Sequence, residues 1–357
     1  MAERKLALWA TPQGFVKAAM ANKATTRNVR GGTEVSFMVD GKYKMTGVLN
    51  AQGQVDRVQT WIDNPVLGDM LVETTYSGYK DFGGVTFPSR IVQTQGGQTS
   101  LDVTVSEVQS NPTVNIQVPH TVTNPAPPPP AQVASEKIAD GVYYLTGGTH
   151  HSAAVEMRDH IVLIESPLGD ARALAVIAKA KELIPNKPIR YVVNTHVHFD
   201  HSGGLRAAVD EGATVVTNQA NRAFYEKAWA APHTLILDKL SQSKKKAKFQ
   251  TVGNTGRLTD GTRTIELYAI MNNPHTTGII MAYLPKEKIL FESDAFTPLP
   301  ANAPGPALPP ANVQFATALY DNIQRLKLDV DTILGGHGPR VAKIADLRAG
   351  LGRNATN

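Results

Sequence analysis

One short segment constrains this chain more than any other, because it gathers four potential metal ligands within six residues. They are His196, His198, Asp200 and His201. The segment directly follows the apolar run 189–193, which is typical of a buried strand. Two histidines that are two residues apart on extended backbone point the same way and can hold one ion. Desolvating this many polar groups at a strand end is costly unless they bind an ion. We therefore predict a metal site, with a surface histidine cluster as the alternative.

The absence of cysteine limits the ligands that such a site can use. It excludes disulfides, thiolate ligands and a cysteine nucleophile, and leaves His, Asp and Glu as the strong ligands. Three further candidates lie downstream, namely His275, Asp294 and His337. Asp294 and His337 follow the apolar runs 289–291 and 332–334, so the ligand loops can collect at one edge of a sheet. Taken singly, Asp294 has a strand-end turn residue as its alternative, and His275 and His337 have an ordinary core or loop histidine as theirs.

The segment from Thr195 to His201 resembles the HxHxDH signature of the metallo-β-lactamase superfamily, and the likeness extends from residue 136 to the end of the sequence. His275, Asp294 and His337 occur in the family's order. The resemblance implies an α/β fold, an αββα metallo-β-lactamase sandwich preceded by a β-rich domain of helix plus antiparallel sheet. It also implies two zinc ions per chain, with iron or mixed metal as alternatives. By this resemblance the first ion is held by His196, His198 and His275, the second by Asp200, His201 and His337, and Asp294 bridges them.

The implied activity is hydrolysis of an ester, lactone, β-lactam or phosphoester by a metal-bound hydroxide. Asp200 would be the catalytic residue that orients the nucleophile or transfers its proton. Dedicated β-lactamases of the superfamily commonly have Cys or Ser at the position of Asp294, which makes β-lactams a less favoured substrate. Two alternatives stay open. One is a mono-iron oxidoreductase similar to persulfide dioxygenases, and the other is a carrier or binding protein whose metal domain is not catalytic.

The chain divides at a proline-rich stretch, because five prolines occur between residues 124 and 131 and such a stretch favours extended polyproline conformation. We predict a β-rich accessory domain over 1–120, a linker over 121–135 and the catalytic domain over 136–357. In the first domain a helix is expected at 11–22, followed by antiparallel strands of alternating polarity. This domain loosely resembles the lipoprotein-carrier half-barrels of periplasmic proteins. The alternative is a domain that only stabilises or dimerises the enzyme.

The substrate and partners are less constrained by the sequence. His150 and His151 lie in an expected hairpin loop, whose counterpart in the family overhangs the metals, and Phe296 lies in the loop after Asp294. We predict these three as substrate contacts, with an exposed histidine pair and a purely structural loop as the alternatives. The net charge of +5 is dispersed and aromatic residues make up only 6%, so the expected partner is a small molecule and not a nucleic acid. We expect no membrane span and allow for a homo-oligomer. A periplasmic or secreted location is expected, and it requires a signal peptide before this numbering, because the first residues lack an apolar signal segment.

Overall fold

The computed structural model describes residues 2–123, 126–127, 129–303, 305 and 307–353, and the chain forms two compact units. The first unit comprises Met1–Pro128 together with Ala231–Ile236. The second comprises Pro129–Ala230 and Leu237–Asn357. The division falls inside the predicted linker, of which residues 124, 125 and 128 lie outside the described part. The sequence does not predict that a segment so far along the chain belongs to the first unit.

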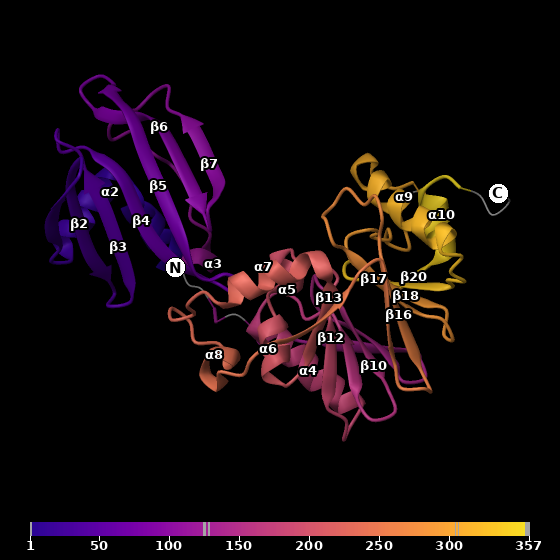
Figure 1. The fold of residues 1–357 in the computed structure, drawn as a ribbon. Coiled ribbons are helices and arrows are strands. Elements are labelled where there is room, and N and C mark those ends of the chain that lie inside the picture. The colour runs from indigo at the N-terminus through magenta and orange to yellow at the C-terminus, as the bar shows by residue number, and fades with distance from the viewer. Residues whose placement is uncertain (1, 124–125, 128, 304, 306, 354–357) are drawn as a thin grey trace. The chain divides into compact units, whose positions relative to one another are not determined.

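The first unit consists of helices and one antiparallel sheet, as the sequence predicts (Figure 1). The helices are α1 (Ala2–Ala10), α2 (Pro12–Ala21) and the single turn α3 (His120–Thr123). The sheet runs in chain order through β1 (Thr25–Val29), β2 (Gly32–Val39), β3 (Tyr43–Leu49), β4 (Val55–Asn64), β5 (Gly68–Asp81), β6 (Thr86–Gln95) and β7 (Gln98–Thr104). The predicted helix at 11–22 is present, and its N-cap Thr11 accepts a hydrogen bond from the backbone of Gly14. Helix α1 is an addition that the sequence analysis missed.

Phe15 of α2 is the central apolar contact between these helices and the sheet. Its side chain is fully buried in a cluster that includes Leu6 of α1 and Phe37 and Met45 of the sheet. Burial of one such aromatic side chain stabilises the fold by roughly 1.5–3 kcal/mol. Gly47 is required beneath the ring, because a Cβ there would lie 2.4 Å from the Phe15 ring.

The segment Ala231–Ile236 is fixed at the start of β5 by Asp69. The Asp69 carboxylate accepts hydrogen bonds from the backbone N–H groups of Thr234 and Leu235, at 2.9 and 3.0 Å. The Asp69 N–H in turn donates to the Pro232 carbonyl at 2.7 Å. These contacts link residues about 165 positions apart in the sequence, which is why local patterns do not reveal them.

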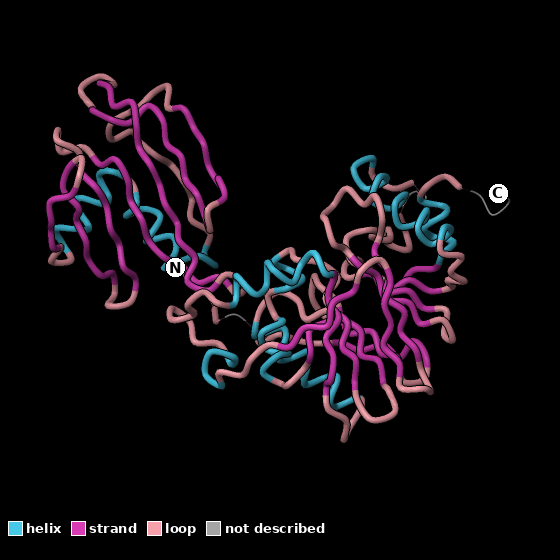
Figure 2. Tube along the Cα trace, viewed as in Figure 1, coloured by secondary structure: helices cyan, strands magenta, loops and turns pink. Residues whose placement is uncertain are grey.

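The second unit contains two sheets with helices on their outer faces (Figure 2). The first sheet has the order β14-β13-β12-β11-β10-β9-β8, with β8 (Ala134–Ala139), β9 (Val142–Thr146), β10 (Ser152–Glu156), β11 (Ile161–Ile164), β12 (Ile189–Val193), β13 (Thr214–Asn218) and β14 (Lys248–Val252). The second sheet runs through β15 (Thr255–Thr259), β16 (Thr264–Ala269), β17 (Ile280–Leu284), β18 (Ile289–Glu292), β19 (Thr332–Gly335) and β20 (Ala342–Lys343). The helices are α4 (Asp170–Leu183), α5 (Phe199–Ser202), α6 (Leu205–Asp210), α7 (Gln219–Trp229), α8 (Lys239–Ser243), α9 (Pro310–Arg325) and α10 (Ile344–Gly350). Within the described residues, no helix combines the length and the apolar character needed to cross a membrane.

The strands of this unit are apolar on both faces because each sheet is covered on both sides. In β12, Val193 belongs to the cluster between the two sheets, while Val192 belongs to the cluster under the helices of the first sheet. In β18, Phe291 faces the intersheet cluster and Leu290 packs with the residues of α9. These three apolar layers confirm the predicted αββα sandwich.

Candidate metal centre

All seven predicted ligand residues lie at one edge of the sandwich, on loops or on the single-turn helix α5. The first four follow β12, His275 lies between β16 and β17, Asp294 follows β18 and His337 follows β19. A backbone hydrogen bond of 2.9 Å, from Ile280 of β17 to the Thr195 carbonyl, ties the first ligand loop to the opposite sheet. The core therefore fixes the loops from both sheets against each other.

The side chains form two groups, in each of which the potential ligand atoms lie within 4.8 Å of one another. The first group consists of His196, His198, His275 and Asp294, and the second of His150, Asp200, His201 and His337. The grouping matches the division that the family resemblance implies. His150 is the exception, because the sequence analysis placed it as a substrate contact. Its Nε2 atom lies 3.0 Å from Oδ2 of Asp200, so it offers the second group a fourth ligand atom.

Asp294 is the carboxylate on which both groups converge. Its Oδ2 atom lies 3.2 Å from Nε2 of His196 and 2.9 Å from Nε2 of His275. The same oxygen lies 3.1 Å from Nε2 of His201, and Oδ1 lies 2.9 Å from Nε2 of His337. Burial alone raises the pKa of Asp294, but the surrounding histidines outweigh burial and hold the pKa far below its usual range. Asp294 is therefore an anion placed between the two groups.

The outer nitrogens of three histidines are engaged, which directs Nε2 of each ring toward Asp294. Nδ1 of His196 lies 3.0 Å from the hydroxyl of Thr195, and Nδ1 of His337 lies 2.9 Å from the carbonyl of Thr149. Nδ1 of His201 donates to the Glu165 carboxylate at 2.8 Å. Partners of this kind fix the tautomer and the orientation of a metal-binding imidazole.

Glu165 is a site residue that the sequence analysis missed. It is fully buried at the end of β11, with φ of 67°, a strained value for a residue other than glycine. One carboxylate oxygen contacts His201, and the other accepts the N–H of Thr195 at 2.7 Å. Burial lowers the pKa of His201, but the carboxylates of Asp294 and Glu165 outweigh it and raise the pKa to about 10. In the sequence, the signal that could have identified Glu165 is its position as a single carboxylate directly after the apolar run 161–164.

Glu292 is a second missed residue, located two positions before Asp294. Its Oε2 atom accepts the N–H groups of Ala295 and Phe296, at 2.9 and 3.1 Å. These bonds close a turn around Asp294, whose own φ of 62° is strained. Complete burial raises the pKa of Glu292 to about 8. Glu292 thus fixes the backbone turn that carries Asp294. In the sequence, only its position at the end of a strand points to this role.

The donor set fits a pair of divalent ions. Nε2 of His196 and Nε2 of His275 are buried and make no hydrogen bond of good geometry, although both approach Asp294. Nε2 of His201 lies 3.0 Å from Nε2 of His337. Tetrahedral coordination at 2.0–2.1 Å places neighbouring ligand atoms about 3.3 Å apart, close to the spacings seen here. Imidazole nitrogens and carboxylate oxygens are ligands that Zn²⁺ accepts, and iron uses them as well.

The other two predicted substrate contacts, His151 and Phe296, lie in different environments. His151 is buried, with Nδ1 2.6 Å from the Tyr144 hydroxyl and Nε2 3.2 Å from the Gly148 carbonyl oxygen. Both of its nitrogens are occupied inside the fold, so we do not retain His151 as a substrate contact. Phe296 lines a cavity of about 330 Å³ that borders His198, Asp200, His275 and Asp294. Asn312 and Phe315 of α9 complete its wall, and the sequence analysis missed both.

Comparison with known proteins assigns a family to the second unit. The model of a family described as the metallo-beta-lactamase superfamily matches residues 137–337. A segment of 76 residues, 21% of this chain, is 32% identical to a linear primary-alkylsulfatase from a Pseudomonas species. That segment spans only 11% of the relative's length.

Solved structures similar to this chain include two metallo-beta-lactamases. The one from Pontibacter korlensis is 21% identical, with a TM-score of 0.47, and the match covers 62% of this chain and 98% of that one. FIM-1 from Pseudomonas aeruginosa, solved in a mono-zinc form, is 19% identical, with a TM-score of 0.48 and coverage of 63% and 96%.

Proposed function

The chain belongs to the metallo-beta-lactamase superfamily, and we propose that it is a hydrolase that uses two divalent metal ions, with zinc as the expected metal. The observation that carries this proposal is the position of Asp294 between two groups of ligand atoms. A shared carboxylate lowers the repulsion between two cations, which supports two ions and not the single iron of a dioxygenase.

Each ligand group has a defined part in this proposal. His196, His198 and His275 would hold the first ion, His201, His337 and Asp200 the second, and Asp294 would contact both. When bound, such ions lower the pKa of a water molecule from about 15.7 toward 7 and polarise the bond under attack. The protein itself supplies no serine, cysteine or threonine nucleophile in this scheme. Its residues position the ions, the substrate and the transferred proton.

Asp200 is the residue best placed to handle the proton. Its side chain is 45% exposed and borders the cavity beside the ligand groups. Burial is the largest influence and raises its pKa, but the hydrogen bond with His150 and the charge of His201 together outweigh burial and lower the pKa, so the carboxylate is ionised at neutral pH. We therefore assign Asp200 to orienting the attacking water and to receiving its proton.

The cavity next to the ligand groups supports an ester with an uncharged, apolar part as the substrate. Phe296 and Phe315 supply its apolar wall, and Asn312 and Thr297 supply neutral polar groups. Among the described residues that line it there is no lysine or arginine to pair with a substrate carboxylate. This favours carboxylic esters and lactones over β-lactams that carry a free carboxylate. Sulfate esters join the candidates because of the similarity to an alkylsulfatase, and phosphoesters remain among them.

The test is a hydrolysis panel with the zinc-loaded chain and a chelator-treated sample. The panel contains p-nitrophenyl butyrate, a γ-lactone, nitrocefin, p-nitrophenyl phosphate and an alkyl sulfate. We expect turnover that a chelator abolishes and zinc restores, and a loss of at least about 100-fold in Asp294→Asn. Asp321→Asn, which changes an exposed carboxylate paired with Arg353, is the matched control and should retain full activity. Turnover that survives the chelator, or that survives Asp294→Asn, would refute the proposal.

A further inference from the structure

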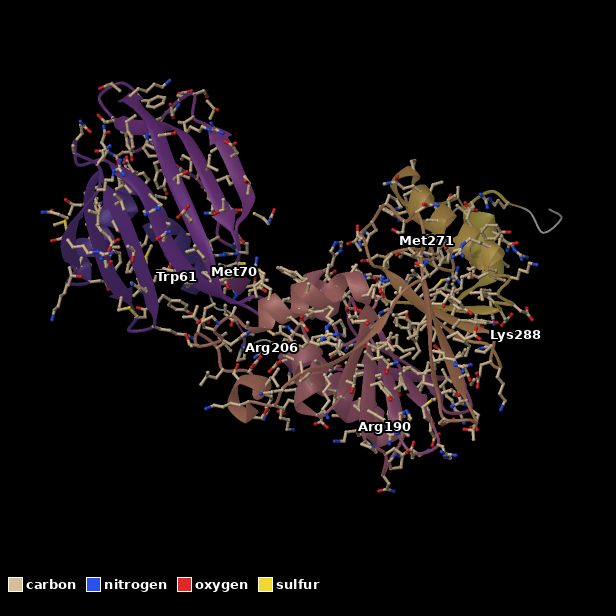
Figure 3. The ribbon with its side chains drawn as sticks, in the orientation of Figure 1. Trp61, Met70, Arg190, Arg206, Met271 and Lys288 are labelled. Atoms are coloured by element: carbon tan, nitrogen blue, oxygen red, sulfur yellow. The ribbon has the colours of Figure 1, made fainter. Side chains whose placement is uncertain are left out.

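A second cavity lies between the two sheets, far along the strands from the ligand loops. It has a volume of about 330 Å³. Arg190 lies next to the first residue of β12, whose other end leads to His196, so the cavity lies at the opposite end of that strand. Figure 3 labels Arg190, whose side chain projects at the lower ends of the strands of this unit. Nothing in the proposed hydrolysis uses this cavity.

Three arginines from three separate segments surround the cavity. Arg158 comes from the turn before β11, Arg190 from β12 and Arg257 from β15. Two carboxylates, Asp159 and Asp260, also line it, so the guanidinium groups outnumber the carboxylates.

Both carboxylates already have partners in the fold. Asp159 accepts Nδ1 of His160 at 2.7 Å and Nη2 of Arg190 at 2.8 Å. Asp260 accepts the backbone N–H of Arg158, as well as N–H groups of its own turn. The contact between Asp260 and the backbone of Arg158 also joins the turns on the two sheets. Neither carboxylate forms an ion pair with the side chain of Arg158 or Arg257 within the described residues.

Several donors around the cavity lack partners within the described residues. The guanidinium groups of Arg158 and Arg257 are exposed and make no hydrogen bond or ion pair there, and the same holds for the amide of Gln250. His160 is 3% exposed, and its Nε2 atom has no hydrogen-bond partner. A buried polar atom without a partner is uncommon in a native fold, because it loses its contacts with water without compensation. The guanidinium groups of Arg158 and Arg257 and the amide of Gln250 thus offer donors from two sheets without an acceptor.

From this geometry we propose that the cavity binds a small organic phosphate or sulfate monoester. Arg158 and Arg257 bind the oxyanion, since guanidinium groups form paired, charge-assisted hydrogen bonds to phosphate and sulfate oxygens. Gln250 adds a neutral donor. The half-buried ring of Tyr191 and the side chain of Leu258 form an apolar wall for the organic part. The volume exceeds that of a bare oxyanion and suits a small ligand.

The test is isothermal titration calorimetry of the zinc-loaded full chain with phenylphosphonate, a stable analogue of a phosphate monoester. Inorganic phosphate serves as the second probe. We expect saturable binding, tighter for phenylphosphonate than for phosphate because of the apolar wall. Arg158→Ala combined with Arg257→Ala should weaken it by at least about tenfold, while the corresponding double lysine variant, which keeps the charge but loses the paired hydrogen bonds, should weaken it less. Both side chains are exposed and have no partner among the residues that the structure describes, so circular dichroism should show a folded double variant.

Two controls distinguish binding at this cavity from a general effect of charge and from binding at the metal centre. Arg4→Ala combined with Arg30→Ala removes the same charge from exposed positions of the first unit and should leave binding unchanged. The Arg158 and Arg257 variants keep all proposed metal ligands, so binding that survives in the double alanine variant belongs to the metal centre. No saturable binding, or equal binding in the double alanine variant, would overturn the proposal. Equal losses in the two double alanine variants would reduce it to a general effect of charge and overturn it as well.

Discussion

Replacement of Glu165 by glutamine should weaken one metal position and leave the other nearly intact. Glu165 is fully buried and uses both oxygens, one for the Thr195 N–H and one for Nδ1 of His201. Glutamine has the same shape, so its amide oxygen can still accept the Thr195 N–H. Its NH₂ group then faces Nδ1 of His201 and donates where the carboxylate accepted. The ring must place its proton on Nε2, which is the nitrogen directed at the metal.

The size of this effect follows from the role of Glu165 as an outer partner of one ligand. Loss of such a partner costs about 10–100-fold in metal affinity. This corresponds to about 1.4–2.8 kcal/mol. His201 belongs to the second ligand group and not to the first, so the loss should fall on one ion of the pair. We expect the affinity of the first position to change by less than about threefold.

The assay is a titration of the metal-free chain with zinc in competition with a chromophoric chelator, which resolves two binding steps. Glu211→Gln is the matched control, because Glu211 is paired at 2.8 Å with the partly exposed Lys181 and is not near the ligand groups. Equal weakening of both steps in Glu165→Gln would show that the residue acts on the whole fold. No change in either step would refute the role assigned to the contact between Glu165 and His201.

Three further predictions concern packing, a buried hydrogen bond and protons. Gly204→Ala should lower the free energy of unfolding by about 1–3 kcal/mol in urea denaturation, since its Cβ would lie 2.5 Å from a neighbouring side-chain carbon. Gly148→Ala, whose Cβ would meet nothing closer than 3.8 Å, should be close to neutral, and equal costs would count against this explanation. Tyr144→Phe removes a buried hydroxyl that contacts His151 and the Gly335 carbonyl, and it should cost about 1–3 kcal/mol by the same method. An unchanged denaturation midpoint would argue against that contact. His201, whose pKa the carboxylates raise to about 10 in the metal-free chain against 6.5 when unfolded, should stabilise that chain below pH 6.5 and lose this contribution as the pH rises to 10. Zinc must displace its proton, so calorimetry at pH 8 in buffers of different ionisation enthalpy should detect about one released proton, and none would contradict the assignment.

Local patterns were sufficient for much of the fold. The apolar run 189–193 coincides with β12, because a strand covered on both faces reads as a continuous apolar segment. The predicted helix at 11–22 has the expected N-cap at Thr11. Helix α1 was missed although Leu6 and Ala10 are four residues apart on one face, since its stability depends on burial against the sheet.

Some residues of the candidate site could likewise be predicted from local sequence patterns, and others depend on contacts between distant segments. The dense ligand segment and the order of the later ligands identify the groups that meet, because each ligand lies at or near a strand end. The two adjacent histidines could not be separated by sequence, since only the hairpin's orientation turns His150 toward Asp200 and His151 into the core. Glu165 and Glu292 resembled ordinary turn residues, and their importance depends on which N–H groups they face in three dimensions. The second cavity likewise depends on arginines that are distant in sequence.

Inductively coupled plasma mass spectrometry of the purified chain tests whether it holds two metal ions. We expect close to two divalent ions per chain, with zinc as the expected metal, and a marked loss of bound metal in His196→Ala combined with His198→Ala. A single iron per chain would favour the dioxygenase alternative. A chain that binds no metal, or a double variant that keeps both ions, would contradict the two-metal centre proposed here.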